Sequence, residues 1–230
     1  MHPRAAFRIS FAAGLLVLAV TLLSATQEPV RPCGNLPQNY APIIAFELAR
    51  SAGDLQAIFG TQEPCRSTMV ERMDAINLVD VLVYIPAYGV FMACFFFGMR
   101  SRHALLGTCG LVVSLVAVLG DFAENACLMN LTPALDPSSI WFALLPWATG
   151  VKWLALGLAG GIAAALYTSS IATVISAAAP WVTVLAIVSP AETGPIISLG
   201  VGLSWLLYLI TAAVASFRPV AVTAEPARPG

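Results

Sequence analysis

Long apolar stretches recur along the chain and are separated by short polar segments. The region from Ala104 to Phe217 contains one basic residue, Lys152, which is also the only lysine of the chain. A helix needs about 20 mainly apolar residues to cross a bilayer. The pattern therefore predicts six transmembrane helices, at 8–25, 75–98, 104–128, 147–167, 170–188 and 196–217.

Composition narrows the class of protein. The 230 residues are 59% hydrophobic and 10% charged, whereas a soluble domain carries about 25% charged residues. A water-soluble fold of this size cannot bury that excess, because much of the surface of a small domain stays exposed. A net charge of −1 without a basic patch excludes nucleic acid as a partner. We therefore expect an all-α, polytopic membrane bundle of about six helices with an outer amphipathic helical segment.

The arginines indicate the topology. Arg4 and Arg8 precede the first predicted crossing, Arg100 and Arg102 lie in the turn after the second, and Arg218 follows the last. Since cytoplasmic loops carry the excess of basic residues, six crossings place these arginines and both termini in the cytoplasm. The predicted divisions are 1–25, a first transmembrane helix or signal anchor, 26–74, an outer helical segment, 75–167, helices two to four with a buried charge cluster, 168–217, helices five and six, and 218–230, a disordered tail.

Two cysteines, Cys33 and Cys65, lie in the outer segment, and each follows a proline. Two thiols on one exposed segment tend to pair in an oxidising compartment, so we expect a disulfide here. The bridge would contribute roughly 3–4 kcal/mol by restricting the unfolded chain. The alternative is two unpaired thiols. No Cys-x-x-Cys motif is present, which disfavours a thiol-exchange enzyme.

The residues between these cysteines predict a helical cap. In 40–60, apolar residues recur at near-helical spacing, while Glu47 and Arg50 take other faces. Gly53 interrupts this pattern, so we expect one amphipathic helix or a pair of helices broken at that glycine. Such a helix would lie on the outer membrane interface or cap the bundle.

Ionisable residues interrupt three of the predicted crossings. A charged side chain inside a membrane is costly, by about 2.5–3.5 kcal/mol on insertion scales, and marks a candidate functional site. At 1.5 Å per residue, each of the three helices carries its polar groups within about 10 Å of the outer face. We therefore expect them to meet, with Lys152 paired to Asp121 or Asp80. The full set is Asp80 and Tyr84 in the second crossing, Asp121, Glu124 and Asn125 in the third, and Lys152 in the fourth.

The charges of this cluster do not balance. Three carboxylates and one ammonium leave an excess of two negative charges, so one carboxyl group is expected to hold a proton. Arg50 from the outer helix or a metal ion could instead supply the missing charge. The cluster could fix helix packing as a buried ion-pair network, bind a ligand or couple to protons, or act in catalysis. A cavity that reaches it would favour a ligand or transport role.

The same residues resemble a family of small bacterial integral membrane proteins without an established function. The family pattern consists of FELA at 46–49, D-x-x-x-Y at 80–84, D-x-x-E-N at 121–125 and a later lysine, in that order, and the resemblance covers about 8–167. It implies a common site and a multi-pass protein of the bacterial cytoplasmic membrane. This chain departs from the pattern by its last two crossings and by Cys33 and Cys65. The matching residues are Glu47, Asp80, Asp121, Glu124, Asn125 and Lys152.

Other classes of site lack their residues. The two histidines, His2 and His103, lie at the cytoplasmic edge, which disfavours a histidine-based zinc or haem site. We predict neither a metal nor a cofactor. Gly157 and Gly161 would let helices pack closely, within one chain or in a homo-oligomer. Membrane lipid and a larger membrane-protein complex are the other expected partners.

The function expected from these features is non-enzymatic. We favour an accessory protein, or one that binds a small ligand or lipid headgroup, built around the carboxylate–lysine cluster. One alternative is a proton-coupled carrier, in which the unbalanced carboxyl group loads and unloads a proton. A second is an intramembrane enzyme that uses two carboxyl groups as acid and base.

Overall fold

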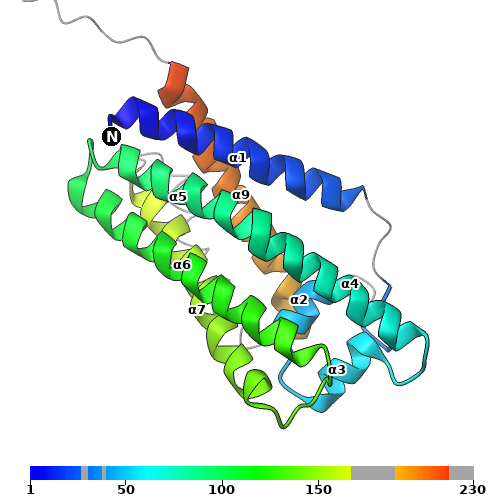
Figure 1. The fold of residues 1–230 in the computed structure, drawn as a ribbon. Coiled ribbons are helices and arrows are strands. Elements are labelled where there is room, and N and C mark those ends of the chain that lie inside the picture. Colours follow the sequence, from blue (N-terminus) through cyan, green and yellow to red (C-terminus); the bar gives the residue numbers. More distant parts are fainter. Residues whose placement is uncertain (27–30, 38–39, 167–189, 218–230) are drawn as a thin grey trace, which may run out of the picture.

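The protein is a bundle of long helices (Figure 1). The computed structural model describes residues 1–26, 31–37, 40–166 and 190–217, and within these ranges every regular element is helical. The predicted all-α class is thereby confirmed. The predicted crossing at 170–188 and the tail at 218–230 lie outside the described residues. In the described part, five helices are long and apolar enough to span a membrane, namely Pro3–Ser24, Cys65–Met99, Ala104–Leu131, Ile140–Ala165 and Gly200–Phe217.

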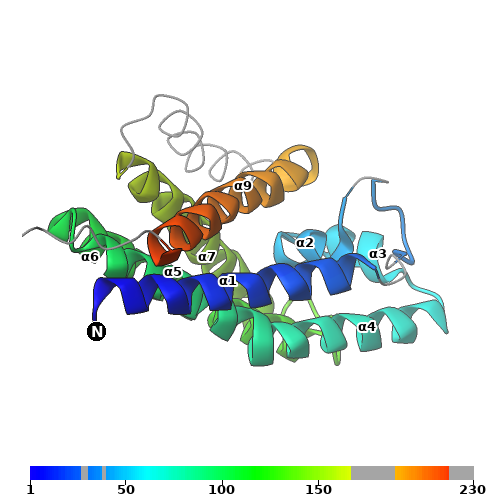
Figure 2. The same ribbon diagram turned by 90° about the horizontal axis from the view of Figure 1, so that it is seen from above.

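The helices follow one another in a simple order. Helix α1 packs on α5 and α9, α5 packs on α6, and α6 packs on α7. Figure 2 shows α1 lying between α9 and α4, with α2 and α3 at the end distant from the N-terminus. The bounds are α1 (Pro3–Ala25), α2 (Pro42–Glu47), α3 (Ala52–Phe59), α4 (Cys65–Val79), η1 (Asp80–Tyr84), α5 (Ile85–Met99), α6 (Ala104–Leu131), α7 (Ile140–Ala165) and α9 (Pro190–Phe217).

The second membrane helix is longer than its apolar stretch predicts. It starts at Cys65 and continues through α4, η1 and α5 without a break. Residues 65–74, expected in the outer segment, therefore form its first turns. Hydropathy missed them because this part is polar, but Met69 and Met73 on its inner face are buried against the outer segment.

The outer segment forms a two-helix cap on the bundle. Its helices α2 and α3 are separated at 48–51, so the predicted break at Gly53 is wrong by a few residues. The reason is Ser51, whose hydroxyl accepts from the Asp54 amide while the Asp54 carboxylate accepts from the Ser51 amide. This reciprocal capping starts a new helix at Ala52. Phe46 and Phe59 then close the cap with their rings 4.9 Å apart.

A disulfide ties the cap to the long helix, as predicted. Cys33 and Cys65 are bonded, with their Cα atoms 5.8 Å apart. The Cys33 amide also donates to the Ile58 carbonyl at 2.9 Å. Gly60 passes close by with φ of 63°, and a Cβ there would lie 2.8 Å from the Cys33 carbonyl oxygen. The bridge thus holds the start of the cap, its second helix and the start of α4 together.

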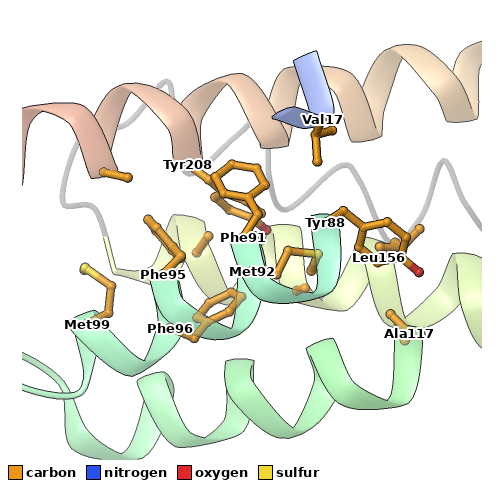
Figure 3. Packing of buried hydrophobic residues seen from close by; sticks show 14 of the residues in the cluster. Val17, Tyr88, Phe91, Met92, Phe95, Phe96, Met99, Ala117, Leu156 and Tyr208 are labelled. Carbon is orange, nitrogen blue, oxygen red and sulfur yellow. The ribbon is translucent and has the colours of Figure 1, made fainter. Parts of the chain in front are cut away.

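The half of the bundle away from the cap is packed with aromatic side chains (Figure 3). The rings of Phe95 and Tyr208 stack at 4.7 Å between α5 and α9, and Phe91 meets Tyr208 edge-on at 6.0 Å. Gly110 of α6 lies against Phe96, where a Cβ would come within 2.1 Å of the ring. Burial of such rings supplies large apolar contact areas, so this half is a densely packed core.

A second apolar cluster lies under the cap, and the predicted polar residues separate the two clusters. On α6, Ala117 belongs to the aromatic cluster and Leu128 to the cluster under the cap. On α7, Leu145 belongs to the cluster under the cap and Trp153 to the aromatic cluster. Asp121, Glu124 and Asn125 of α6, and Thr149 and Lys152 of α7, occupy the layer between them and are buried.

Candidate functional site

Lys152 lies at the centre of the polar layer. The side chain extends from α7, and the residue is 4% exposed. The Nζ atom lies 2.9 Å from Glu47 Oε2 and 3.5 Å from Asp121 Oδ1, and it also contacts Glu124 Oε2. The predicted pairing with Asp121 is confirmed. The nearer partners are the two glutamates, because Glu124 lies one turn beyond Asp121 on the same face of α6.

Glu47 reaches this layer from the cap. Its Oε2 accepts from Lys152 and, at 3.1 Å, from Trp153 Nε1, while its backbone carbonyl accepts from Thr149 Oγ1 at 2.9 Å. The helical spacing predicts a separate face of the outer helix for Glu47, and the family resemblance implies that it belongs to the common site; the residue is buried in the bundle. Burial raises the pKa of the Glu47 carboxyl group above its ordinary value, and the Lys152 ammonium opposes that rise.

A hydrogen-bonded chain continues from Asp121 to Asp80. Asn125 Nδ2 donates to Asp121 Oδ1 at 3.1 Å and to Asp80 Oδ2 at 3.0 Å. The Tyr88 hydroxyl donates to Asp121 Oδ2 at 2.8 Å. Asp80 is therefore joined to the network through Asn125, and no Lys or Arg of the described residues forms an ion pair with it.

A widened helical turn positions Asp80 and Tyr84. In η1 the Ile85 amide donates to the carbonyl of Asp80, five residues back. Pro86 follows and has no amide hydrogen to offer the carbonyl four residues before it, so the regular ladder cannot continue there. Single π-helical turns of this kind are frequent at functional sites. Asp80 and Tyr84 of this turn both line a cavity in the bundle.

Arg50 forms no hydrogen bond or ion pair with the described residues of the network. Its Nη1 donates to the Ala49 carbonyl at 2.9 Å, and its backbone amide donates to Asp54 Oδ2 at 2.8 Å. It forms no ion pair with the described carboxylates. Nor does any group of three or more His, Cys, Asp or Glu side chains in the described ranges have an arrangement that could hold a metal ion.

A cavity of about 890 Å³ adjoins the network. Its walls come from α1, α2, α4, η1, α5, α6, α7 and α9, and Asp80, Asp121 and Lys152 form part of its lining. Several lining side chains are apolar and exposed, such as Leu18 and Leu206, so the cavity opens on the apolar surface of the bundle. This is the arrangement expected for a ligand or transport role.

The two ends of the network differ in burial and in ion pairing, although Glu47 and Lys152 line the cavity as Asp80 does. We call Lys152 with Glu47 and Glu124 the closed end, since all three residues are buried and directly paired. We call Asp80, together with the three aromatic residues that line the same cavity, the open end. There the rings of Tyr84, Tyr88 and Trp205 line the cavity in mutual contact, with centroids 6.1 Å (Tyr84–Tyr88), 5.8 Å (Tyr84–Trp205) and 5.4 Å (Tyr88–Trp205) apart.

Two residues of the site, Trp153 and Trp205, are not expected from the sequence. The family resemblance does point to Glu47, which is also an acid within the apolar run Ala45–Ala49. Trp153 follows Lys152 directly, but its contact with Glu47 depends on where the cap packs. Trp205 carried no local signal, since only the packing of α9 brings it to the two tyrosines.

The small-residue face of α7 is covered by the chain itself. Gly157 is buried and Gly161 is half-buried, so packing within one chain makes use of both. Homo-oligomerisation through this face stays a prediction.

Comparisons of the chain with protein-family models, with curated proteins and with solved structures find no match.

Proposed function

We propose that this protein is a membrane receptor or carrier-like binding protein that takes a small amphipathic ligand or lipid from the outer half of the bilayer, without catalysing a reaction. One observation carries the proposal: a cavity of about 890 Å³ reaches buried carboxyl groups and opens between apolar side chains. Ligand pockets of about 300–1,000 Å³ with apolar walls and few polar groups are typical of small-molecule sites.

The chemistry of the lining supports an amphipathic ligand. Phe91, Leu206 and Leu209 line one part of the cavity and would contact an apolar moiety. Asp80 and Asn77 line another part and would orient a polar group. A ligand that had only one of these characters would leave the other part of the wall unmatched.

We propose a multi-pass protein of the bacterial cytoplasmic membrane, and the arrangement of the helix ends supports an orientation with the cap on the outer side. In Figure 1 the N-terminus, the α5–α6 turn and the end of α9 lie at one end, opposite α2 and α3. The first two carry Arg4, Arg8, Arg100 and Arg102. By the preference of basic residues for the cytoplasm, that end faces inward and the cap faces outward.

Filling the cavity tests this function. Gly202 of α9 lines the cavity, and an added Cβ there meets nothing within 4 Å. Gly202→Trp should therefore occupy the cavity while the bundle still folds. Gly200→Trp is the matched control, because Gly200 also has open space around it but is outside the cavity lining.

The readout is native mass spectrometry of protein extracted from its membrane in a mild detergent. We expect the wild-type protein and Gly200→Trp to retain a bound small molecule or lipid, and Gly202→Trp to lose it. Wild-type protein without any bound mass, or an equal bound mass in all three proteins, would overturn the proposal.

A further inference from the structure

The protein already contains one site for a cation, at the closed end. There the Lys152 ammonium is held by carboxylate oxygens of Glu47, Asp121 and Glu124. Its Nζ atom also lies over the Trp153 ring, 4.7 Å from the centroid. Carboxylates and an aromatic face are thus combined around one positive charge, and both kinds of group attract a cation.

The open end combines the same groups around the cavity. Asp80 begins the η1 turn, and the rings of Tyr84, Tyr88 and Trp205 line the same cavity. The centroids of these rings lie within 6.1 Å of one another. Within the described residues, no basic side chain lies within ion-pair distance of Asp80. Arg72 lines the same cavity but is eight residues earlier on the same helix, or about 12 Å along the axis.

The network also carries an excess of negative charge, which favours a cation as the ligand. The network holds four carboxyl groups and one ammonium, so full ionisation would leave an excess of three negative charges. Uncompensated charges of one sign in a buried site are costly. Asn77 adds an unmet polar group, since it is 1% exposed, lines the cavity and has no partner for its Nδ2 among the described residues.

We propose that the cavity binds an organic cation with apolar substituents, such as a quaternary ammonium, whose charge lies between Asp80 and the rings of Tyr84, Tyr88 and Trp205. The inference rests on the proposed function and names its ligand class. Aromatic faces favour weakly hydrated organic cations, and the apolar walls around Leu206 and Leu209 suit their substituents. The cation can come from two sources, the headgroup of a zwitterionic phospholipid or a free lipophilic compound.

The test compares two probes of nearly the same size and shape but opposite charge, tetraphenylphosphonium and tetraphenylborate. Their binding to the purified full-length protein is measured by equilibrium dialysis. We expect the phosphonium to bind and the borate to bind at least tenfold more weakly. Comparable binding of both, or preference for the borate, would overturn the inference.

Three variants locate the probe. Asp80→Asn should weaken phosphonium binding about tenfold, or about 1.4 kcal/mol, because it removes the negative charge that faces the cation. The amide oxygen of the new residue can still accept from Asn125, so the fold should persist. Trp205→Leu should weaken binding severalfold, because it removes one of the aromatic faces that attract the cation. Asp74→Asn is the matched control, because Asp74 is a carboxylate of the same helix, six residues before Asp80 and outside the cavity lining, whose hydrogen bond from Thr132 an asparagine can also accept; it should change binding less than twofold.

Competition separates the two sources of the cation. Displacement of the phosphonium by phosphatidylcholine but not by phosphatidylglycerol with the same acyl chains assigns the cation to a lipid headgroup. Displacement by neither lipid assigns it to a free compound, and displacement by phosphatidylglycerol contradicts the cation site. If Gly202→Trp loses a native ligand but the wild-type protein does not bind the phosphonium, the cavity function stands and the cation class is wrong.

Discussion

The closed and open ends of one polar network use similar side chains in different surroundings. At the closed end, Glu47, Glu124 and Lys152 are buried and in direct contact, so the charge of Lys152 is paired with carboxylates of the protein itself. At the open end, Asp80 is half-buried, faces the cavity and receives one amide donor from Asn125. Direct ion pairs between buried side chains fix packing, whereas a carboxyl group beside a cavity and without a basic partner is available to a ligand. We therefore propose a structural role for the closed end and a binding role for the open end.

Removing the lysine should break the closed end and produce the largest effect. Lys152→Met leaves Glu47, Asp121 and Glu124 in a buried layer without their cation. Loss of one partner of a buried ion pair is expected to destabilise by about 3–5 kcal/mol. We expect little monodisperse protein and a strongly lowered midpoint of thermal unfolding, measured by differential scanning fluorimetry in detergent.

Rescue identifies which carboxylate matters most. Adding Glu124→Gln to Lys152→Met should restore more folded protein than adding Asp121→Asn. Glu124 is the closer partner of Lys152, while Asp121 keeps donors from Tyr88 and Asn125. Equal failure of both double variants would show that the lysine does not act through these ion pairs.

The disulfide should have the next largest effect, because it restrains the cap that delivers Glu47. Replacing Cys33 and Cys65 by serine frees a loop with a sequence separation of 32 residues. The expected loss is about 3–4 kcal/mol in the chain-entropy model. Amide hydrogen exchange should become faster in α2 and α3 and change little in α5. Cys109→Ser, at an exposed free cysteine, is the control, and unchanged exchange in the cap would refute the restraint.

The meeting of Asp80, Asp121 and Lys152 could be predicted because their depths follow from helix geometry. Each lies on a helix that must cross the membrane, and the rise of 1.5 Å per residue fixes its depth. The same reasoning fails for Glu47, because α2 is a short helix of the cap whose position depends on packing and on the disulfide. Its burial emerges only when the cap is folded onto the bundle.

Only some residues of the open end could be predicted from the sequence. Asp80 and Tyr84 share a helix and could be recognised together, but Trp205 is more than a hundred residues away and joins them through the contact of α9 with α5. The cavity itself depends on how helices from both halves of the chain are spaced. Spacing of this kind is a property of side-chain packing, which a pattern of apolar and polar residues does not contain.

A small change at the contact between α6 and α7 should have the smallest effect and sharpen the contrast. Gly120 lies against the backbone of Lys152, where an added Cβ would come within 2.9 Å of its nitrogen and 3.2 Å of its Cα. A backbone atom cannot move aside as a flexible side chain can. Gly120→Ala should therefore push the two helices apart at the closed end and destabilise by about 1–3 kcal/mol, the usual range for overpacking.

Gly150→Ala is the matched control, because Gly150 lies two residues before Lys152 on α7 and an added Cβ there meets nothing within 4 Å. It should leave the unfolding midpoint unchanged or raise it slightly, since alanine favours a helix over glycine by up to about 1 kcal/mol. Both variants are compared by thermal unfolding in the same detergent. If Gly120→Ala were as stable as Gly150→Ala, the close approach of the two backbones would not be needed to hold Lys152 against Glu124. The closed end would then tolerate a larger separation of α6 and α7, contrary to what the direct contact of Lys152 with Glu124 leads us to expect.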